Sequence, residues 1–226
     1  MDLAKEIGKK GFNAAIIAQY AIENPDNIER LIEGIIAPKG SIRFGYDKVL
    51  RLISEKQPEL VYPYFEVFRK LSLCDNSFLK WGAILTIANL TAADSDKKFD
   101  AMFDEYYAPI KGPVMVTAAN IIGGSVKIIN AKPYLIDKII NEILKVEKAK
   151  YELHDEPSPE CRNVAIGHAI DTFDAIFSQV KDKDSVIKFV KRQLKNTRQA
   201  VVKKAQKFLK NHQTPWPAAI VNRTKR

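Results

Sequence analysis

The chain has 226 residues, of which 46% are hydrophobic and 28% are charged, and this balance is typical of a folded protein rather than a low-complexity one. No apolar run approaches the roughly 18 residues of a membrane helix, and the first residues lack the apolar block of a signal peptide. Two cysteines, Cys74 and Cys161, are too few for a disulfide framework. We therefore expect a soluble protein of the reducing cytoplasm that does not bind a membrane.

The net charge of +9 is concentrated near the C-terminus. Residues 181–226 contain 14 Lys and Arg against 2 acidic residues, whereas residues 1–180 contain 22 basic and 25 acidic residues. Such an asymmetry is found where a protein attracts nucleic acid or another polyanion. A solvated pair of terminal helices followed by a tail explains it as well, so both interpretations stay open here.

Apolar residues recur at spacings of three and four almost throughout the chain, which predicts amphipathic helices. In residues 42–53, for example, Ile42, Tyr46, Val49 and Ile53 share one helical face. Proline, glycine and capping residues separate these segments, as at Pro38 and Gly40. The sequence therefore predicts an all-helical chain.

The predicted helices form pairs after a lone N-terminal helix near residues 3–22. The first helices of the pairs are expected near 27–36, 58–72, 95–108, 132–150 and 184–194. The second helices are expected near 41–55, 77–92, 113–130, 159–180 and 197–211. Residues 212–226 break this pattern and form a basic tail that contains proline and tryptophan.

The second helices share a register in which a basic residue precedes a small or apolar residue and a long apolar stripe. The corresponding positions 43, 80, 115, 162 and 198 are 37, 35, 47 and 36 residues apart, although position 115 carries no charge. A period near 36 with one insertion of about ten residues is typical of helical repeats. The last of these segments, residues 196–205, most plainly resembles a HEAT repeat, and Pro63 stands inside a first helix where HEAT units often kink.

The resemblance to HEAT repeats implies a right-handed α-solenoid of about five helix pairs with an extra N-terminal helix. It would occupy residues 1–211 as a single domain, with residues 212–226 as the tail, and the second helices would line a concave surface. Physical reasoning agrees, since one helix pair cannot bury its apolar face alone whereas stacked pairs form a continuous core.

Catalytic and metal-binding patterns are weak. The sequence contains no nucleophile elbow and no phosphate-binding glycine loop. Residues 154–156 (His-Asp-Glu) offer adjacent metal ligands, but a solvated loop is the simpler interpretation. Asp100 and Asp104 share a helix face, yet acidic residues at a helix start also complement its dipole. We expect no enzymatic activity, no cofactor and no metal.

Three local features are candidates for an interaction surface. Gly123 and Gly124 lie inside a predicted helix and indicate either close helix packing or contact with a partner. Tyr106 and Tyr107 end a helix, so we expect at least one ring to be exposed, with Tyr107 and Tyr62 as candidates for an adhesive patch. Trp216 in the tail is a candidate anchor on this chain or on a neighbour.

These observations favour a non-catalytic scaffold that binds a protein or peptide on its concave face. The alternative is a nucleic-acid-binding protein, similar in general design to the HEAT-like alkylpurine DNA glycosylases but without a Trp-Trp-Asp-like run to carry their chemistry. Basic residues gathered along one groove would favour nucleic acid, and dispersed ones would favour a protein partner. The candidate residues for the concave face are Arg43, Arg51, Lys80, Lys127, Arg162, Arg198 and Lys203.

Overall fold

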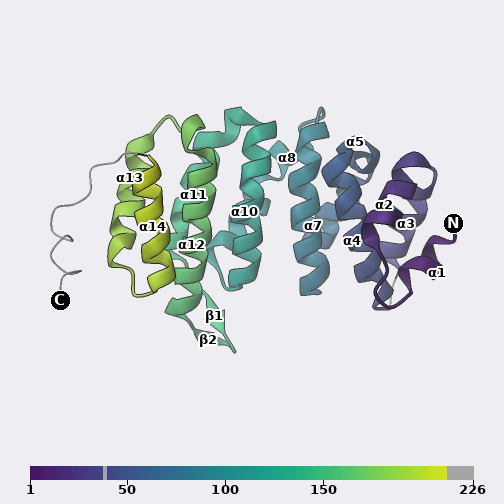
Figure 1. Cartoon of the computed structure of the whole chain (residues 1–226), viewed down its shortest axis with the longest axis horizontal. Helices are drawn as coiled ribbons and strands as arrows, with labels where there is room; N and C mark the ends of the chain where they lie inside the picture. The colour runs from purple at the N-terminus through teal and green to yellow at the C-terminus, as the bar shows by residue number, and fades with distance from the viewer. Residues whose placement is uncertain (38–39, 213–226) are drawn as a thin grey trace.

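The computed structural model describes residues 1–37 and 40–212 and is mostly helical (Figure 1). The α-helices and strands, in chain order, are α1 (Leu3–Ile7), α2 (Ala14–Glu23), α3 (Asn27–Ile36), α4 (Ile42–Lys56), α5 (Pro58–Val61), α6 (Phe65–Ser72), α7 (Ser77–Leu90), α8 (Lys98–Ala101), α9 (Phe103–Tyr107), α10 (Met115–Ala131), α11 (Ile136–Leu144), β1 (Glu152–Leu153), β2 (Glu156–Pro157), α12 (Pro159–Ile176), α13 (Lys183–Arg192) and α14 (Gln199–Asn211). Short 3-10 helices extend or join several of them, namely η1 (Tyr62–Tyr64), η2 (Thr91–Ala93), η3 (Ala108–Lys111), η4 (Pro133–Leu135), η5 (Lys145–Lys148), η6 (Phe177–Gln179) and η7 (Gln193–Lys195). The predicted all-helical class is confirmed, apart from one small hairpin.

Six helices form a row from one end of the molecule to the other (Figure 1). In this row α2, α4, α7, α10, α12 and α14 pack in succession, and each of α3, α6, α11 and α13 packs against a helix of the row. The apolar core is continuous along the row because each helix buries its apolar stripe against the next one. Among the described residues, no helix is long and apolar enough to cross a membrane.

The predicted N-terminal helix over residues 3–22 is wrong, because the chain breaks into α1 and α2. Gly11 lies between them with a φ of 72°, a conformation that favours glycine. Asn13 then begins α2, since its Oδ1 accepts hydrogen bonds from the amides of Ala15 and Ile16 at 3.0 and 3.3 Å. Local capping therefore overrides a continuous apolar pattern.

The helices expected near 95–108 and 132–150 are also interrupted. Asp94 accepts hydrogen bonds from the amides of Lys98 and Phe99 at 2.8 and 3.0 Å, so the first of these begins only at Lys98. The second ends at η5, and the insertion after it forms the hairpin β1–β2. His154 and Asp155 make its turn with φ values of 53° and 61°, and both are exposed, as expected for a solvated loop.

The expectation that a ring of Tyr106 or Tyr107 is exposed is wrong, since both side chains are buried. The Tyr106 hydroxyl donates to the Ile84 carbonyl at 3.1 Å, and the Tyr107 hydroxyl shares a 3.0 Å hydrogen bond with Ser125. Burial raises the pKa of both phenols. Tyr62 is held similarly, with its hydroxyl donating to Asp94 at 2.7 Å. Tyr106 and Tyr107 therefore belong to the core and form no exposed patch, whereas Tyr62 is half-buried.

The acidic cluster before α10 is organised by one buried lysine. Lys132 Nζ lies 3.0 Å from Asp94 Oδ2 and 2.9 Å from Asp100 Oδ2, and its side chain is only 5% exposed. Burial alone would lower the pKa of Lys132, but hydrogen bonds to the two carboxylates outweigh it and raise the pKa. Burial likewise opposes ionisation of Asp94 and Asp100, yet their hydrogen bonds keep both pKa values low. Asp104 is separate and pairs with Lys138 at 3.1 Å.

Candidate functional site

A groove runs along α7 between α4 and α10, and we call it the α7 groove. It consists of three adjoining hollows of about 680, 320 and 500 Å³. Arg51 and Leu85 line both the first and the second hollow. The second and third share Glu55, Ala88, Asn89 and Lys127. The groove is therefore continuous, with an apolar end near the start of α7 and a polar end near its last turn.

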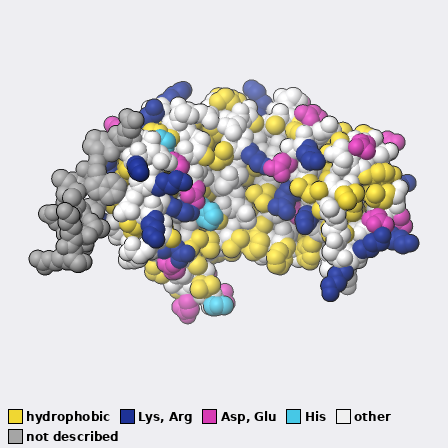
Figure 2. Space-filling view, in the orientation of Figure 1, with side chains coloured by type: hydrophobic (Ala, Val, Ile, Leu, Met, Phe, Trp, Pro, Cys, Tyr) yellow, Lys and Arg dark blue, Asp and Glu magenta, His cyan; other side chains and the backbone are white. Residues whose placement is uncertain are grey.

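Three aromatic rings line the apolar end, of which those of Phe44 and Phe78 are exposed and that of Trp81 is half-buried. Phe78 contacts Phe44 and Trp81 edge-on, with ring centroids 5.6 Å apart in each pair. Phe78 is 67% exposed and Phe44 39% exposed, which is high for phenylalanine. The Trp81 ring is fixed, because its Nε1–H donates to Thr117 Oγ1 of α10 at 2.9 Å. Figure 2 shows hydrophobic side chains gathered in a band across the lower part of this face, over α7 and α10.

An acidic side chain, Asp47, lies beneath these rings. The residue is only 8% exposed, and its Oδ1 is enclosed without a hydrogen-bond partner among the described residues. The carboxylate packs directly against Gly82 of α7, where a Cβ atom would lie 2.1 Å from Oδ1. Burial raises the pKa of Asp47 to about 6, and the positive charge of Arg51 only partly opposes this. Asp47 and Gly82 both line the apolar end of the groove.

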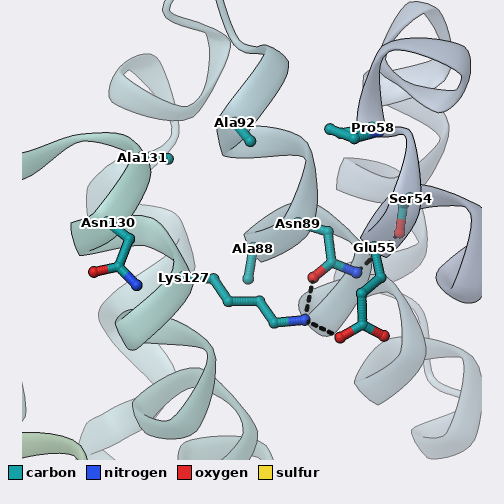
Figure 3. A pocket seen from close by; sticks show the side chains of 9 residues that line it. All are labelled: Ser54, Glu55, Pro58, Ala88, Asn89, Ala92, Lys127, Asn130 and Ala131. Atoms are coloured by element: carbon teal, nitrogen blue, oxygen red, sulfur yellow. Dashed lines mark hydrogen bonds and ion pairs between the residues drawn. The ribbon is translucent and has the colours of Figure 1, made fainter. Parts of the chain in front are cut away.

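The polar end is crossed by a network from three helices (Figure 3). Lys127 of α10 donates to Glu55 of α4 at 2.8 Å and to Asn89 of α7 at 2.7 Å. The Asn89 amide in turn donates to Ser54 Oγ at 2.9 Å. The hydrogen bond from Lys127 lowers the pKa of Glu55. The network fixes the three groove-lining helices relative to one another and satisfies the polar groups at this end.

The predicted basic residues are only partly brought together. Arg51 and Lys127 line the α7 groove. Arg43 instead donates its Nε–H to the Ile35 carbonyl at 2.8 Å and so satisfies the end of α3. Arg198 pairs with Glu160 at the start of α12. Three of these four side chains are therefore engaged with groups of the chain itself.

The remaining candidates lie apart from the α7 groove. Lys80 is half-buried on α7 but does not line the groove, and Lys203 is exposed on α14. Arg162 lines a separate hollow of about 180 Å³ beside the hairpin. Trp216 lies outside the described residues. The seven basic residues thus do not form one stripe.

The glycine pair in α10 has two different surroundings. A Cβ atom on Gly124 would lie 3.2 Å from both Ala88 Cβ and Tyr106 Oη, so this glycine permits close packing of α10 on α7. A Cβ atom on Gly123 would meet no atom within 4 Å. Gly123 is exposed and lines the middle of the α7 groove. Packing accounts for the second glycine and leaves the first as an open part of the groove floor.

The sequence reasoning did not single out Asp47, Phe44 or Phe78. The sequence holds one indication for Asp47: the residue directly follows Tyr46 in an apolar helix segment, where a buried acidic residue is unusual. Phe78 stands in the first turn of α7, two residues after the N-cap Asn76. Its exposure depends on neighbouring helices and is not encoded locally. Within residues 1–37 and 40–212, no three His, Cys, Asp or Glu side chains converge as metal ligands do.

No protein-family model matches the sequence, and no curated protein matches it. One solved structure, described as the crystal structure of an engineered protein, is 18% identical with a TM-score of 0.46. The alignment covers 95% of this chain and 89% of the engineered protein.

Proposed function

We propose that this protein is a non-catalytic scaffold that binds a peptide or an extended protein segment in the α7 groove. The observation that supports this most is the aromatic cluster of exposed Phe44 and Phe78 with half-buried Trp81 in a continuous hollow. Contiguous exposed aromatic side chains are typical of interaction sites, because covering them removes apolar surface from water. Burying one phenylalanine fully contributes about 2 kcal/mol.

The dimensions of the groove suit a short extended segment. Helix α7 has 14 residues, which corresponds to a length of about 21 Å. An extended chain advances about 3.3 Å per residue, so about six residues would occupy the groove. The apolar end offers hydrophobic contacts, whereas Lys127, Glu55 and Asn89 at the polar end already hydrogen-bond one another.

The pairing of the basic residues gives less support to nucleic-acid binding. Arg43, Lys127 and Arg198 each already interact with an acceptor of the chain. Phosphate binding would have to displace these acceptors, which reduces the gain from each contact. We keep nucleic acid as the alternative for Lys80, Arg162 and Lys203, for which the described residues provide no ion pair.

We infer further that the row of helices is a right-handed, HEAT-like solenoid of about five pairs in one domain, and that the α7 groove belongs to its concave face. The successive packing of α2, α4, α7, α10, α12 and α14 supports this. A cytoplasmic location fits the two free cysteines, Cys74 and Cys161.

The test is selection of a random 12-residue peptide library, displayed on phage, against the immobilised full chain. We expect enriched peptides that bind the wild type and lose binding to the F78A/W81A double variant. As a matched control, L73A removes another exposed apolar side chain, 58% exposed, that does not line the groove, and it should leave binding unchanged. Peptides that bind the double variant equally well, or no enrichment at all, would refute the proposal.

Nucleic-acid binding is tested in parallel with fluorescently labelled single- and double-stranded oligonucleotides over a salt titration. Binding whose logarithm falls linearly with the logarithm of salt concentration, and whose slope becomes shallower in K80A or K203A, would favour the alternative.

A further inference from the structure

The apolar end of the α7 groove combines two features that fit one kind of ligand group. The ionisable carboxylate of Asp47 and three aromatic rings, those of Phe44, Phe78 and Trp81, line the same hollow. The carboxylate accepts no hydrogen bond from the described residues, although buried polar groups in proteins are nearly always paired. Oδ1 is enclosed, so a partner supplied from the groove would approach the carboxylate at Oδ2, which is not among the enclosed unpaired atoms.

We propose that the apolar end is a specificity pocket for a single basic side chain, lysine or arginine, of the bound peptide. This inference rests on the proposed peptide-binding function and names the residue type that the groove selects. The terminal cation would pair with Asp47, and the methylene stem would pack against Phe78 and Trp81.

Charge complementarity argues for a cation rather than for a neutral donor. A cation over the face of an aromatic ring is attracted by the negative ring face, and Trp is the strongest of these partners. A charged donor also forms a stronger hydrogen bond with a carboxylate than a neutral donor does. Lysine and arginine both bury apolar stems beside their charged ends, which suits the Phe44, Phe78 and Trp81 walls.

Two cations of the protein, Lys48 and Arg51, also line this hollow, but neither forms an ion pair with Asp47 among the described residues. Lys48 lies over the Phe12 ring, with its Nζ 6.0 Å from the ring centroid. Arg51 stands four residues after Asp47 on α4 but forms no ion pair with it. Arg51 lines both this hollow and the adjoining one, so a second basic residue of the peptide would meet a like charge there. The pocket therefore suits one basic residue with neutral or apolar neighbours rather than a polybasic run.

Gly82 is part of this arrangement. Any larger residue at this position would collide with the carboxylate, because a Cβ atom would lie 2.1 Å from Asp47 Oδ1 and 2.3 Å from Oδ2. The absence of a side chain lets the carboxylate lie against the backbone of α7 at the base of the groove. Two positions 35 residues apart thus create the pocket together.

The experiment uses pools of acetylated, amidated seven-residue peptides whose central residue is fixed and whose other positions are random. We expect pools with central lysine or arginine to bind the full chain best. For the best individual sequence, replacing the central lysine by norleucine should weaken binding to the wild type about tenfold or more. In D47N the lysine and norleucine peptides should bind alike, which is a double-mutant cycle for the cation–carboxylate contact.

The outcomes separate this inference from the proposed function. If peptides bind and F78A weakens them, but lysine and norleucine bind the wild type equally, the pocket is not cation-selective while the groove function stands. If D47N keeps the full preference for lysine, Asp47 is not the partner and the inference is overturned. If no pool binds the wild type, both proposals fail. The norleucine comparison on the wild type needs no variant to fold.

Discussion

The substitution D47N should stabilise the protein. The pKa of Asp47 is raised from 3.8 to about 6 because the carboxylate is buried. A carboxyl group that binds its proton more tightly in the folded state stabilises the protein fully below pH 3.8, and that stability is lost as pH rises through 6. Each pKa unit corresponds to about 1.4 kcal/mol, so ionised Asp47 costs about 3 kcal/mol at pH 7.5. Asparagine has nearly the same shape and carries no charge.

The size of the gain depends on pH in a way that identifies its cause. With the same two pKa values, the cost of ionised Asp47 falls to about 1 kcal/mol at pH 4.5, because most of the group is protonated in the folded protein. The advantage of D47N over the wild type should therefore shrink by about 2 kcal/mol between pH 7.5 and pH 4.5. Charges elsewhere change equally in both proteins and cancel in this difference.

Urea unfolding followed by far-ultraviolet circular dichroism at the two pH values measures this directly. D171N is a suitable control, because Asp171 is an exposed carboxylate paired with Lys204. It should change stability by at most about 1 kcal/mol. A D47N variant that is less stable than the wild type at pH 7.5, or whose advantage is the same at both pH values, would refute the reasoning.

Three further outcomes are expected. Replacing Lys132 in K132M should destabilise the protein by about 3–5 kcal/mol, because it leaves the buried Asp94 and the half-buried Asp100 without a cation. K138M, at an exposed pair, should cost at most about 1 kcal/mol, and urea unfolding measures both changes. G123A should raise the thermal midpoint, with a gain of about 1 kcal/mol, because its methyl group meets open space. G124A should gain less stability or lose it, because its methyl group would lie 3.2 Å from atoms of Ala88 and Tyr106. Equal effects of the two substitutions would contradict the packing. F78A should change unfolding free energy by at most about 0.5 kcal/mol but weaken selected peptides about tenfold, and a large loss of stability would show that the ring is structural.

The sequence determined most of the helices by itself. Apolar spacing and local stop signals depend on residues within one or two turns, so α4, α7 and α14 begin and end within about two residues of the predicted bounds. Where the apolar pattern and the capping signals conflicted, the sequence led to a wrong prediction of a helix. In residues 3–22 the apolar pattern continues through the break, and only the cap at Asn13 with Gly11 shows where α2 begins.

The candidate site was decided by tertiary structure. Lys127 appears in the sequence as a free cation, but its partner Glu55 lies 72 residues away and reaches it only because α4 and α10 flank α7. Tyr107 at a helix end seemed exposed, yet α10 covers it and Ser125 binds its hydroxyl. Asp47 gains its buried, unpaired state from Gly82 on the neighbouring helix. Local periodicity fixes which face of a helix is apolar, whereas the charge and exposure of a side chain depend on the helices that pack beside it.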